Sequence, residues 1–374
     1  MNIPAHPPEL AERVLDLALQ IQQIPAPTFS EHARAAFILK RFKKEGLKRV
    51  ALDEVGNVYA QLTGKGAARP VVVSAHIDTI FPPDTNLSIT RSAERIHAPG
   101  LGDNSIGVAA LFGLVWALEH EKTVLPGDLW LVANVAEEGL GNLLGMHAVV
   151  GRFGPEPLAY IVLEGMSLGR VYHRGLGVQR FRITAETPGG HSWSDFGQPS
   201  AIHELAELIT QLASIPLSRD PRTTLNVGTV NGGFSINTIA PSAGMELDLR
   251  SEDLRALEAL VAQVQQLVAS AARSGVEIQI EPIGARPTGA LPPDHDLVAM
   301  AADVLRSLGE EPQLSVGSTD ANVPLSRGYP AMCIGITTGG GAHSTAEYID
   351  IPPLVKGLAQ LHAVVSQAFE RLED

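Results

Sequence analysis

Two adjacent carboxylates, Glu137 and Glu138, follow an apolar stretch that is typical of a buried strand. Neighbouring like charges repel each other, and removing them from water is costly unless a positive charge lies nearby. Either the pair lies in solvent on a loop, or a cation binds beside it. The second alternative makes this pair a candidate metal site.

Further potential metal ligands lie at or near the ends of other predicted strands. His76 and Asp78 are two residues apart just beyond an apolar run, a spacing that in extended chain puts both side chains on one face. Asp103 lies in a glycine-flanked loop before a predicted helix, Glu164 ends another apolar run, and His343 follows a later strand in a loop. In open α/β sheets ligands bind beyond the carboxyl ends of the strands, so one site could collect these groups.

Each of these residues alone has an ordinary structural explanation, since a single loop histidine is usually solvated or satisfied by its neighbours. The combination carries more weight, because unrelated loops need not all place a carboxylate or an imidazole after an apolar strand. Two imidazoles and several carboxylates, with no thiolate nearby in sequence, favour Zn²⁺ or Co²⁺ and suit Mn²⁺ less well. A bridging aspartate between two ligand pairs would suit two ions about 3.5–4 Å apart.

The elements that must position these residues alternate between helix and strand. Helices are expected from about residue 9, from Ser30 as N-cap to residue 44 with Gly46 as the stop, and over 105–120, 296–308 and 353–371. Strands are expected over 57–62, 71–75, 129–135, 331–336 and a run that ends at Glu164. Because these strands are continuously apolar, helices should cover both faces of the sheet. This pattern predicts an α/β fold with an α/β/α layered, mixed-sheet catalytic domain.

The middle of the chain has a different pattern. Residues 178–187 and 243–251 alternate between apolar and polar, which is typical of a sheet with one solvated face. Helical patterns cover 200–213 and 253–273, and a further strand follows at 276–283. We therefore predict that an α+β domain of residues 177–290 is inserted into a discontinuous main domain, which consists of residues 1–176 and 291–374.

Composition restricts the classes of function. The net charge of -13 argues against a nucleic-acid partner and is compatible with a site rich in carboxylates. The single cysteine, Cys333, excludes an internal disulfide and suits a reducing compartment. The longest nearly apolar run, residues 106–118, is too short to span a bilayer, which takes about 20 residues. The first residues lack the pattern of a signal peptide, so we expect a cytoplasmic protein with no membrane partner.

Taken in order, the candidate residues match a known family. The sequence resembles the M20 metallopeptidases, the dinuclear zinc group that includes tripeptide aminopeptidase and glutamate carboxypeptidase. The resemblance covers nearly the whole chain through the ordered set HxD, GxxDN, EE, E, GGHS, N and AHS. It implies two Zn²⁺ ions, one held by His76 and Glu164 and the other by Glu138 and His343. Asp103 would bridge the two ions.

The resemblance also implies roles for two carboxylates that do not bind metal. Asp78 would orient the ring of His76, because metal-bound histidines usually need a partner for their second nitrogen. Glu137 would be the general base that takes a proton from the attacking water.

The inserted domain resembles the ferredoxin-like lid and dimerisation domain of the family. Its GGHS motif implies that His191 stabilises the oxyanion of the tetrahedral intermediate, in dimeric relatives at the active site of the partner subunit. Asn237 would contact the substrate. Arg250 would bind a substrate carboxylate, for which the planar guanidinium is suited. The chain is therefore expected to form a homodimer through this domain.

Three residues keep alternative interpretations. Arg250 could instead pair with a carboxylate inside its own sheet. Arg286 could bind substrate like Arg250, or be a surface arginine near a turn. Asp320 lies in a segment that resembles the glycine-containing loop near the metals, where it could line the pocket or shape a turn.

We expect hydrolysis of the amide bond of a short peptide, as in a tripeptidase or an aminopeptidase. The alternative is an N-acyl amino acid or carbamoyl amidohydrolase, or a carboxypeptidase, that uses the same two metals. A hypothesis of a different class comes from residues 165–169, which match GxSxG and would make Ser167 a serine-hydrolase nucleophile. That nucleophile must open a helix, whereas the residues that follow indicate extended chain.

Overall fold

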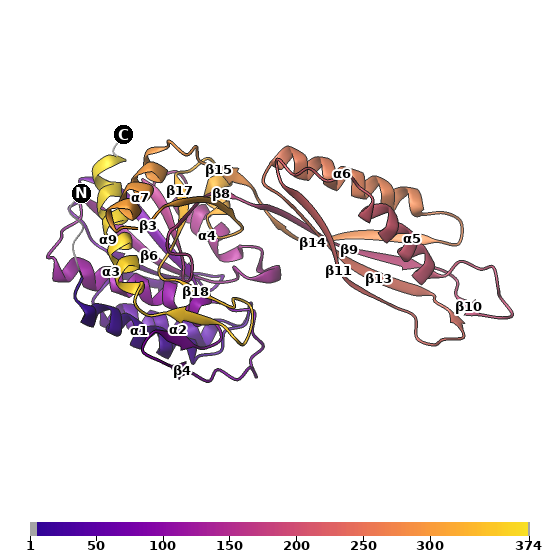
Figure 1. Ribbon diagram of the computed structural model, residues 1–374, viewed down its shortest axis with the longest axis horizontal. Helices are drawn as coiled ribbons and strands as arrows, with labels where there is room; N and C mark the ends of the chain where they lie inside the picture. Colours follow the sequence, from indigo (N-terminus) through magenta and orange to yellow (C-terminus); the bar gives the residue numbers. More distant parts are fainter. Residues whose placement is uncertain (1–5, 373–374) are drawn as a thin grey trace. The chain divides into compact units, whose positions relative to one another are not determined.

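A computed structural model describes residues 6–372. The chain forms two compact units, of which unit 2 is Leu176–Thr288 and unit 1 comprises the chain on either side of it. Figure 1 shows both units in the colours of the sequence.

Unit 1 is built on a nine-stranded mixed sheet. Its strand order is β1 (Lys48–Leu52), β2 (Val58–Leu62), β6 (Gly127–Asn134), β3 (Ala68–His76), β7 (Ala159–Glu164), β17 (Ala331–Gly335), β8 (Arg170–Gly175) and β15 (Gly289–Ala290), and β16 (Gln313–Gly317) also pairs with β8. The central strand β3 is parallel to both β6 and β7, and β7 is parallel to β17. The carboxyl ends of these four strands therefore share one edge of the sheet.

Helices cover both faces of this sheet. One layer comprises α1 (Pro8–Gln22), α2 (His32–Lys44), α3 (Ile106–His120), α7 (Asp296–Ser307) and α9 (Leu354–Arg371), which pack on one another, α2 through the stacking of its Phe42 on Phe112 of α3. The other layer comprises α4 (Leu144–Phe153) and α8 (Asn322–Ser326), and Phe153 of α4 packs against Tyr59 and Trp130 of the sheet. The strands between the layers are apolar on both sides, as expected for a doubly covered sheet. The predicted α/β class is confirmed.

The segment Leu101–His120 is long and apolar enough to cross a membrane by length and composition. However, 94% of its most apolar window is buried inside the protein. The segment contains α3, which therefore belongs to the protein core.

A second, smaller antiparallel sheet in unit 1 joins distant parts of the chain. Its strand order is β18 (Gly339–Gly340), β19 (Tyr348–Asp350), β5 (Arg95–His97) and β4 (Thr90–Arg91). This sheet places the loop between β18 and β19 beside the segment that leads into α3.

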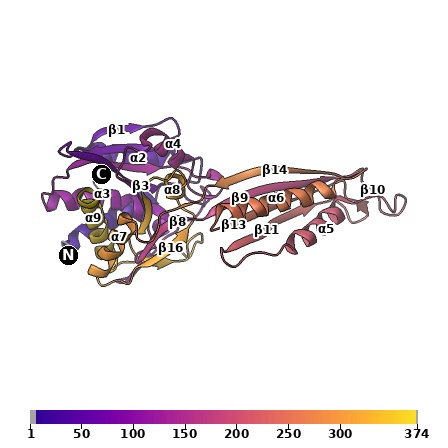
Figure 2. The ribbon, with the colours of Figure 1, turned by 90° about the horizontal axis from the view of Figure 1, so that it is seen from above.

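Unit 2 is an α+β sandwich with its own core. Its main sheet has the order β11 (Thr223–Gly232), β13 (Ser242–Ser251), β9 (Gly177–Glu186) and β14 (Glu277–Arg286), and α5 (Ala201–Ala213) and α6 (Leu254–Ala271) pack on one face. Figure 2 shows both helices along this sheet. A β-α-β-β-α-β succession with this strand order is ferredoxin-like, as predicted. Two short strands, β10 (Gly190–His191) and β12 (Thr238–Ile239), form a separate ribbon.

One predicted helix boundary is wrong. α2 begins at His32 with Glu31 at the N-cap position, because the N–H of Ser30 donates to the carbonyl of Pro27 (2.8 Å) and closes a turn before the helix. Gly46 follows the helix as predicted, with a positive φ of 74°.

Candidate active site and metal centre

Three neighbouring strands deliver candidate ligands to one edge of the central sheet. His76 is the last residue of β3 and Glu164 the last of β7, while Glu137 and Glu138 are the third and fourth residues after the end of β6. Asp103 approaches from the turn before α3. Gly165 makes this approach possible, because a Cβ there would lie 1.9 Å from the carbonyl oxygen of Gly102.

Asp103 lies at the centre of the candidate ligands. Its Oδ1 lies 3.1 Å from Nε2 of His76, and its Oδ2 lies 3.2 Å from Nε2 of His343. Nε2 of His343 is also 3.2 Å from Oε1 of Glu138, and Nε2 of His76 is 3.9 Å from Oε2 of Glu164. The five predicted ligands thus form two groups of three that share Asp103, and within each group the ligand atoms lie within 4.8 Å of one another.

This geometry fits two divalent cations. A tetrahedral ion with bonds of about 2.0–2.1 Å separates its ligand atoms by roughly 3.3 Å, close to the histidine–aspartate distances of 3.1 and 3.2 Å. The donor set of three carboxylates and two imidazoles is negatively charged unless cations are present. Nitrogen and oxygen ligands of this kind suit Zn²⁺ and related ions.

The electrostatics of the histidines support the same conclusion. Burial lowers the pKa of His76, but hydrogen bonds to Asp103, Asp78 and Glu164 outweigh that effect and raise the pKa well above its usual value. Hydrogen bonding, first to Asp103, raises the pKa of His343 to about 10. In the absence of a metal ion, the carboxylates therefore stabilise the protonated form of both imidazoles. Divalent cations would displace these protons, since a ligating imidazole must be neutral.

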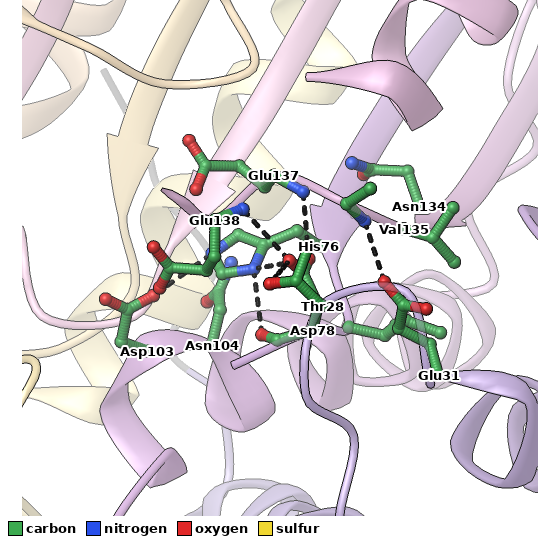
Figure 3. A network of polar contacts seen from close by, with 12 residues as sticks. Thr28, Glu31, His76, Asp78, Asp103, Asn104, Asn134, Val135, Glu137 and Glu138 are labelled. Atoms are coloured by element: carbon green, nitrogen blue, oxygen red, sulfur yellow. Dashed lines mark hydrogen bonds and ion pairs between the residues drawn. The ribbon is translucent and has the colours of Figure 1, made fainter. Parts of the chain in front are cut away.

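Asp78 organises the loops around these ligands (Figure 3). Its side chain is fully buried, and its two oxygens accept the backbone N–H groups of Glu137 (3.0 Å) and Glu138 (2.9 Å). Oδ2 also accepts the hydroxyl of Thr28 (2.9 Å). Nδ1 of His76 lies 3.2 Å from the carbonyl oxygen of Asp78 and 3.5 Å from Oδ1. Asp78 thus contacts the ring of His76 and fixes the turn that carries both glutamates.

The two glutamates leave this turn in different directions. Each is 5% exposed, and Figure 3 shows the side chain of Glu138 extending toward Asp103 while that of Glu137 lies above it in this view. Glu138 therefore lies with Asp103 and His343 in one group of possible ligand atoms. Glu137 lies with His76 and Glu138 in a further group, whose possible ligand atoms are within 4.8 Å of one another.

Two further anchors of this region were missed in the sequence. Oε1 of Glu31 accepts the N–H groups of Phe29 (3.0 Å) and Ala136 (3.1 Å), which ties the start of α2 to the glutamate turn. Arg34 is buried and donates to the carbonyl oxygens of Ile24 and Ile77. The sequence around Glu31 and Arg34 gives no signal of these bonds, because their partners lie in distant parts of the chain.

Asp320 also lies close to this centre. Its side chain is fully buried and accepts a bond of 2.6 Å from Asn134, which pairs with His76 in the sheet. Burial raises the pKa of Asp320 to about 7. The carboxylate of Asp320 therefore faces inward, and the local turn is stabilised separately by Thr319 Oγ1, which accepts from the N–H of Ala321.

The other predicted site residues belong to unit 2. His191 pairs with Thr238 across the β10–β12 ribbon, and the carbonyl oxygen of Asn237 accepts from the N–H of Ser192 (3.0 Å). His191 and Asn237 therefore lie together.

Arg250 and Arg286 are opposite Val178 on the two strands that flank β9, so they share one face of the sheet. Arg250 bonds Asp248 on its own strand (2.6 Å). Arg286 is 7% exposed, and the interpretation as a surface arginine is therefore wrong.

The environment of Ser167 does not match a serine-hydrolase nucleophile. Ser167 lies in the turn between β7 and β8, and its hydroxyl is 3.2 Å from the hydroxyl of Tyr172. A strand rather than a helix follows over Arg170–Gly175. A nucleophile elbow needs a strand-to-helix turn to expose the serine.

Comparisons with known proteins agree with the geometry. The model of peptidase family M20/M25/M40 matches residues 72–367. The chain is 25% identical over 375 residues to succinyl-diaminopimelate desuccinylase of Corynebacterium glutamicum. This alignment covers 98% of each of the two chains.

Crystal structures with the same fold include three peptidases. A tripeptidase from Staphylococcus aureus has a TM-score of 0.83 at 20% identity, and covers 96% of this chain and 99% of its own. Aminopeptidase PepT from Bacillus cereus has a TM-score of 0.79 at 22% identity, and the match covers 96% of this chain and 98% of PepT. YxeP from Bacillus subtilis is described as a dinuclear metal binding peptidase from family M20. It has a TM-score of 0.70 at 17% identity, and the match covers 97% of this chain and 99% of YxeP.

Proposed function

Because the chain belongs to peptidase family M20/M25/M40, we propose that it hydrolyses the amide bond of short peptides with two bound divalent metal ions, Zn²⁺ in the first instance. The predicted family is thereby confirmed, and the chain is a hydrolase. Its substrate and its metal are the proposed part.

The observation that carries the proposal is the pair of ligand groups that share Asp103, with Glu137 beside them. His76 and Glu164 are assigned to one ion and Glu138 and His343 to the other. Bound ions of this kind polarise a carbonyl group and lower the pKa of water to about 7.

Glu137 is the proposed general base. It accepts a proton from the attacking water and delivers that proton to the nitrogen of the leaving amine. Its near-complete burial suits proton transfer, since few water molecules compete for the carboxylate. Asp78 holds the backbone of Glu137 and so orients this base.

His191 is the proposed donor to the oxyanion. Its Nδ1 accepts the backbone N–H groups of Trp193 (3.2 Å) and Ser194 (3.4 Å). A neutral ring in this arrangement carries its proton on Nε2, which can donate to a developing negative charge. Asp195 stabilises the turn by accepting the N–H of His191 (2.7 Å).

The remaining parts of the proposal concern unit 2 and the cell. Asn237 and the two arginines Arg250 and Arg286 are proposed to bind the substrate, the arginines through its carboxylate. Unit 2 is proposed to form the lid and the interface of a homodimer, with His191 acting at the site of the partner subunit. We also propose a cytoplasmic location.

A second candidate function is hydrolysis of an N-acyl amino acid. It is favoured by the similarity to a desuccinylase along 98% of the chain. The same base and ligands would serve both reactions, because each breaks an amide bond. The two functions differ in whether the substrate needs a free amino terminus.

A substrate panel separates these functions. The metal-loaded enzyme would be assayed with dipeptides, tripeptides, the same peptides with acetylated amino termini, and N-acetyl and N-succinyl amino acids. The proposal expects cleavage of short peptides and loss of cleavage when the amino terminus is blocked. Preferential cleavage of the N-acyl amino acids would replace the proposal by the second candidate.

A pair of inhibitors tests the class of chemistry. A chelator is expected to abolish turnover, and added Zn²⁺ or Co²⁺ to restore it, while a serine-directed phosphonate has no effect. Full activity in the chelator with inactivation by the phosphonate would instead support Ser167 as nucleophile.

A further inference from the structure

Glu347 is a buried carboxylate that connects two loops of the metal centre. Its side chain is fully buried, and its Oε1 accepts the backbone N–H groups of Gly102 (2.6 Å) and Asp103 (2.9 Å). Oε2 accepts the N–H of Gly100 (3.1 Å). One carboxylate therefore binds three N–H groups of the turn that carries the shared ligand Asp103. Such charge-assisted bonds are among the strong hydrogen bonds of proteins.

The same residue closes the loop that carries His343. The N–H of Glu347 donates to the carbonyl of Ser344 (3.1 Å), and its own carbonyl accepts from the N–H of Ala98 (3.1 Å). The next residue pairs with His97 across β19 and β5. Main-chain and side-chain bonds thus join the His343 loop to the Asp103 turn.

This connection matters because Asp103 faces both histidines. Its oxygens lie 3.1 Å from His76 and 3.2 Å from His343, and a functional site needs its groups held to about 0.5 Å. On its other side the turn is held by Asn104, whose Nδ2 donates to the carbonyl of Leu163 (2.7 Å) next to Glu164. The turn is therefore bonded to the chain segments of both ligand groups.

We propose that Glu347 is a positioning residue of the metal centre, which fixes Asp103 relative to His343 before a metal ion binds. It acts through the backbone of Asp103. The ion assigned to Glu138 and His343 depends on it most, because Glu347 joins the segments that carry two of its three ligands, Asp103 and His343. The inference rests on the metal ligands of the proposed function and is independent of the substrate.

Metal-binding measurements on two variants test this role. E347A removes all three acceptor bonds. E347Q can keep the bonds to Gly102 and Asp103 but turns an amide N–H₂ toward the N–H of Gly100. Wild-type and variant proteins are freed of metal, and the dissociation constants of both Zn²⁺ ions are measured by competition with a chromophoric chelator. We expect one of the two ions to lose about 10–100-fold in affinity in E347A and less in E347Q.

Asp53 provides the matched control. Its Oδ1 accepts the N–H groups of Val55 (3.2 Å), Gly56 (2.9 Å) and Asn57 (2.8 Å), in a turn without any assigned metal ligand. D53A therefore removes the same number of backbone bonds, together with the side-chain bonds that Oδ2 accepts from Asn57 (2.8 Å) and Tyr59 (2.9 Å). It is expected to melt at a lower temperature, as E347A does, but to keep the wild-type metal affinity.

The outcomes separate this inference from the proposed function. If E347A and E347Q bind both ions within threefold of wild type, or if D53A loses as much affinity as E347A, Glu347 has no positioning role. If the wild-type protein binds two ions and E347A lowers the affinity as expected, but the wild-type protein cleaves no amide, the proposed function fails and the inference stands. A wild-type protein that binds no divalent ion overturns both.

Discussion

Replacing Asp78 by Asn is expected to weaken both the fold and metal binding. Asp78 accepts the backbone N–H groups of Glu137 and Glu138 with separate oxygens, at 3.0 and 2.9 Å. Asn has one carbonyl oxygen, so one of these two N–H groups then faces an amide N–H₂ instead of an acceptor. Both N–H groups are in the turn that presents the base and a metal ligand.

The size of both effects follows from this geometry. Leaving one buried N–H without its acceptor costs about 1–3 kcal/mol of unfolding free energy. For a domain of this size a loss of about 2 kcal/mol lowers Tm by about 4–8 °C. The variant also weakens the support of the His76 ring, and changes of this kind lower metal affinity by about 10–100-fold.

Calorimetry on the metal-free protein and chelator competition for Zn²⁺ measure the two effects separately. Asp128→Asn is the control, because Asp128 also accepts with both oxygens, from the N–H of Gly64 (3.0 Å) and from the side-chain amide of Gln61, but lies at the opposite end of β6. It should lower Tm and leave metal affinity unchanged. Wild-type metal affinity in D78N, or an equal loss in D128N, would refute the role assigned to Asp78.

Three further predictions concern the base, the lid and acid stability. Glu137→Gln should lower kcat by about 10²–10⁴-fold, and elemental analysis should find both metal ions still bound. Loss of an ion in this variant would show that Glu137 is a metal ligand instead. If His191 serves the partner subunit, an equimolar co-assembled mixture of inactive H191A and E137Q chains should recover about a quarter of wild-type activity, whereas an inactive mixture would place His191 in its own subunit. Burial lowers the pKa of His362 to about 4 and also lowers that of its stacked neighbour His6. At these two histidines the folded state therefore binds fewer protons than the unfolded state, whose histidines titrate near 6.5, so the contribution of this pair lowers stability as pH drops from about 6.5 toward 4. H362N should lose less Tm than wild type between pH 7 and pH 5, and equal losses would contradict this explanation.

The elements that local patterns predicted share a physical property. β3, β6 and β7 are continuously apolar because helices cover both of their faces, and α3 is apolar all round because it lies in the core. β1 and β11 were not located, since both are largely exposed and their side chains alternate poorly. Such strands are specified by pairing with a neighbour, which leaves little trace in their own sequence.

The sequence by itself determined the kinds of groups available for chemistry, their order along the chain and their places at strand ends. Buried strands impose apolar residues, so a carboxylate or imidazole at the end of one is conspicuous. The tertiary structure decided which groups meet. Asp103 contacts His76 and His343 with different oxygens, and Glu347 binds a turn 244 residues away in the chain, at Asp103. Hydrogen bonds of this range depend on the packing of whole elements, and a local pattern of polar and apolar residues carries no record of them.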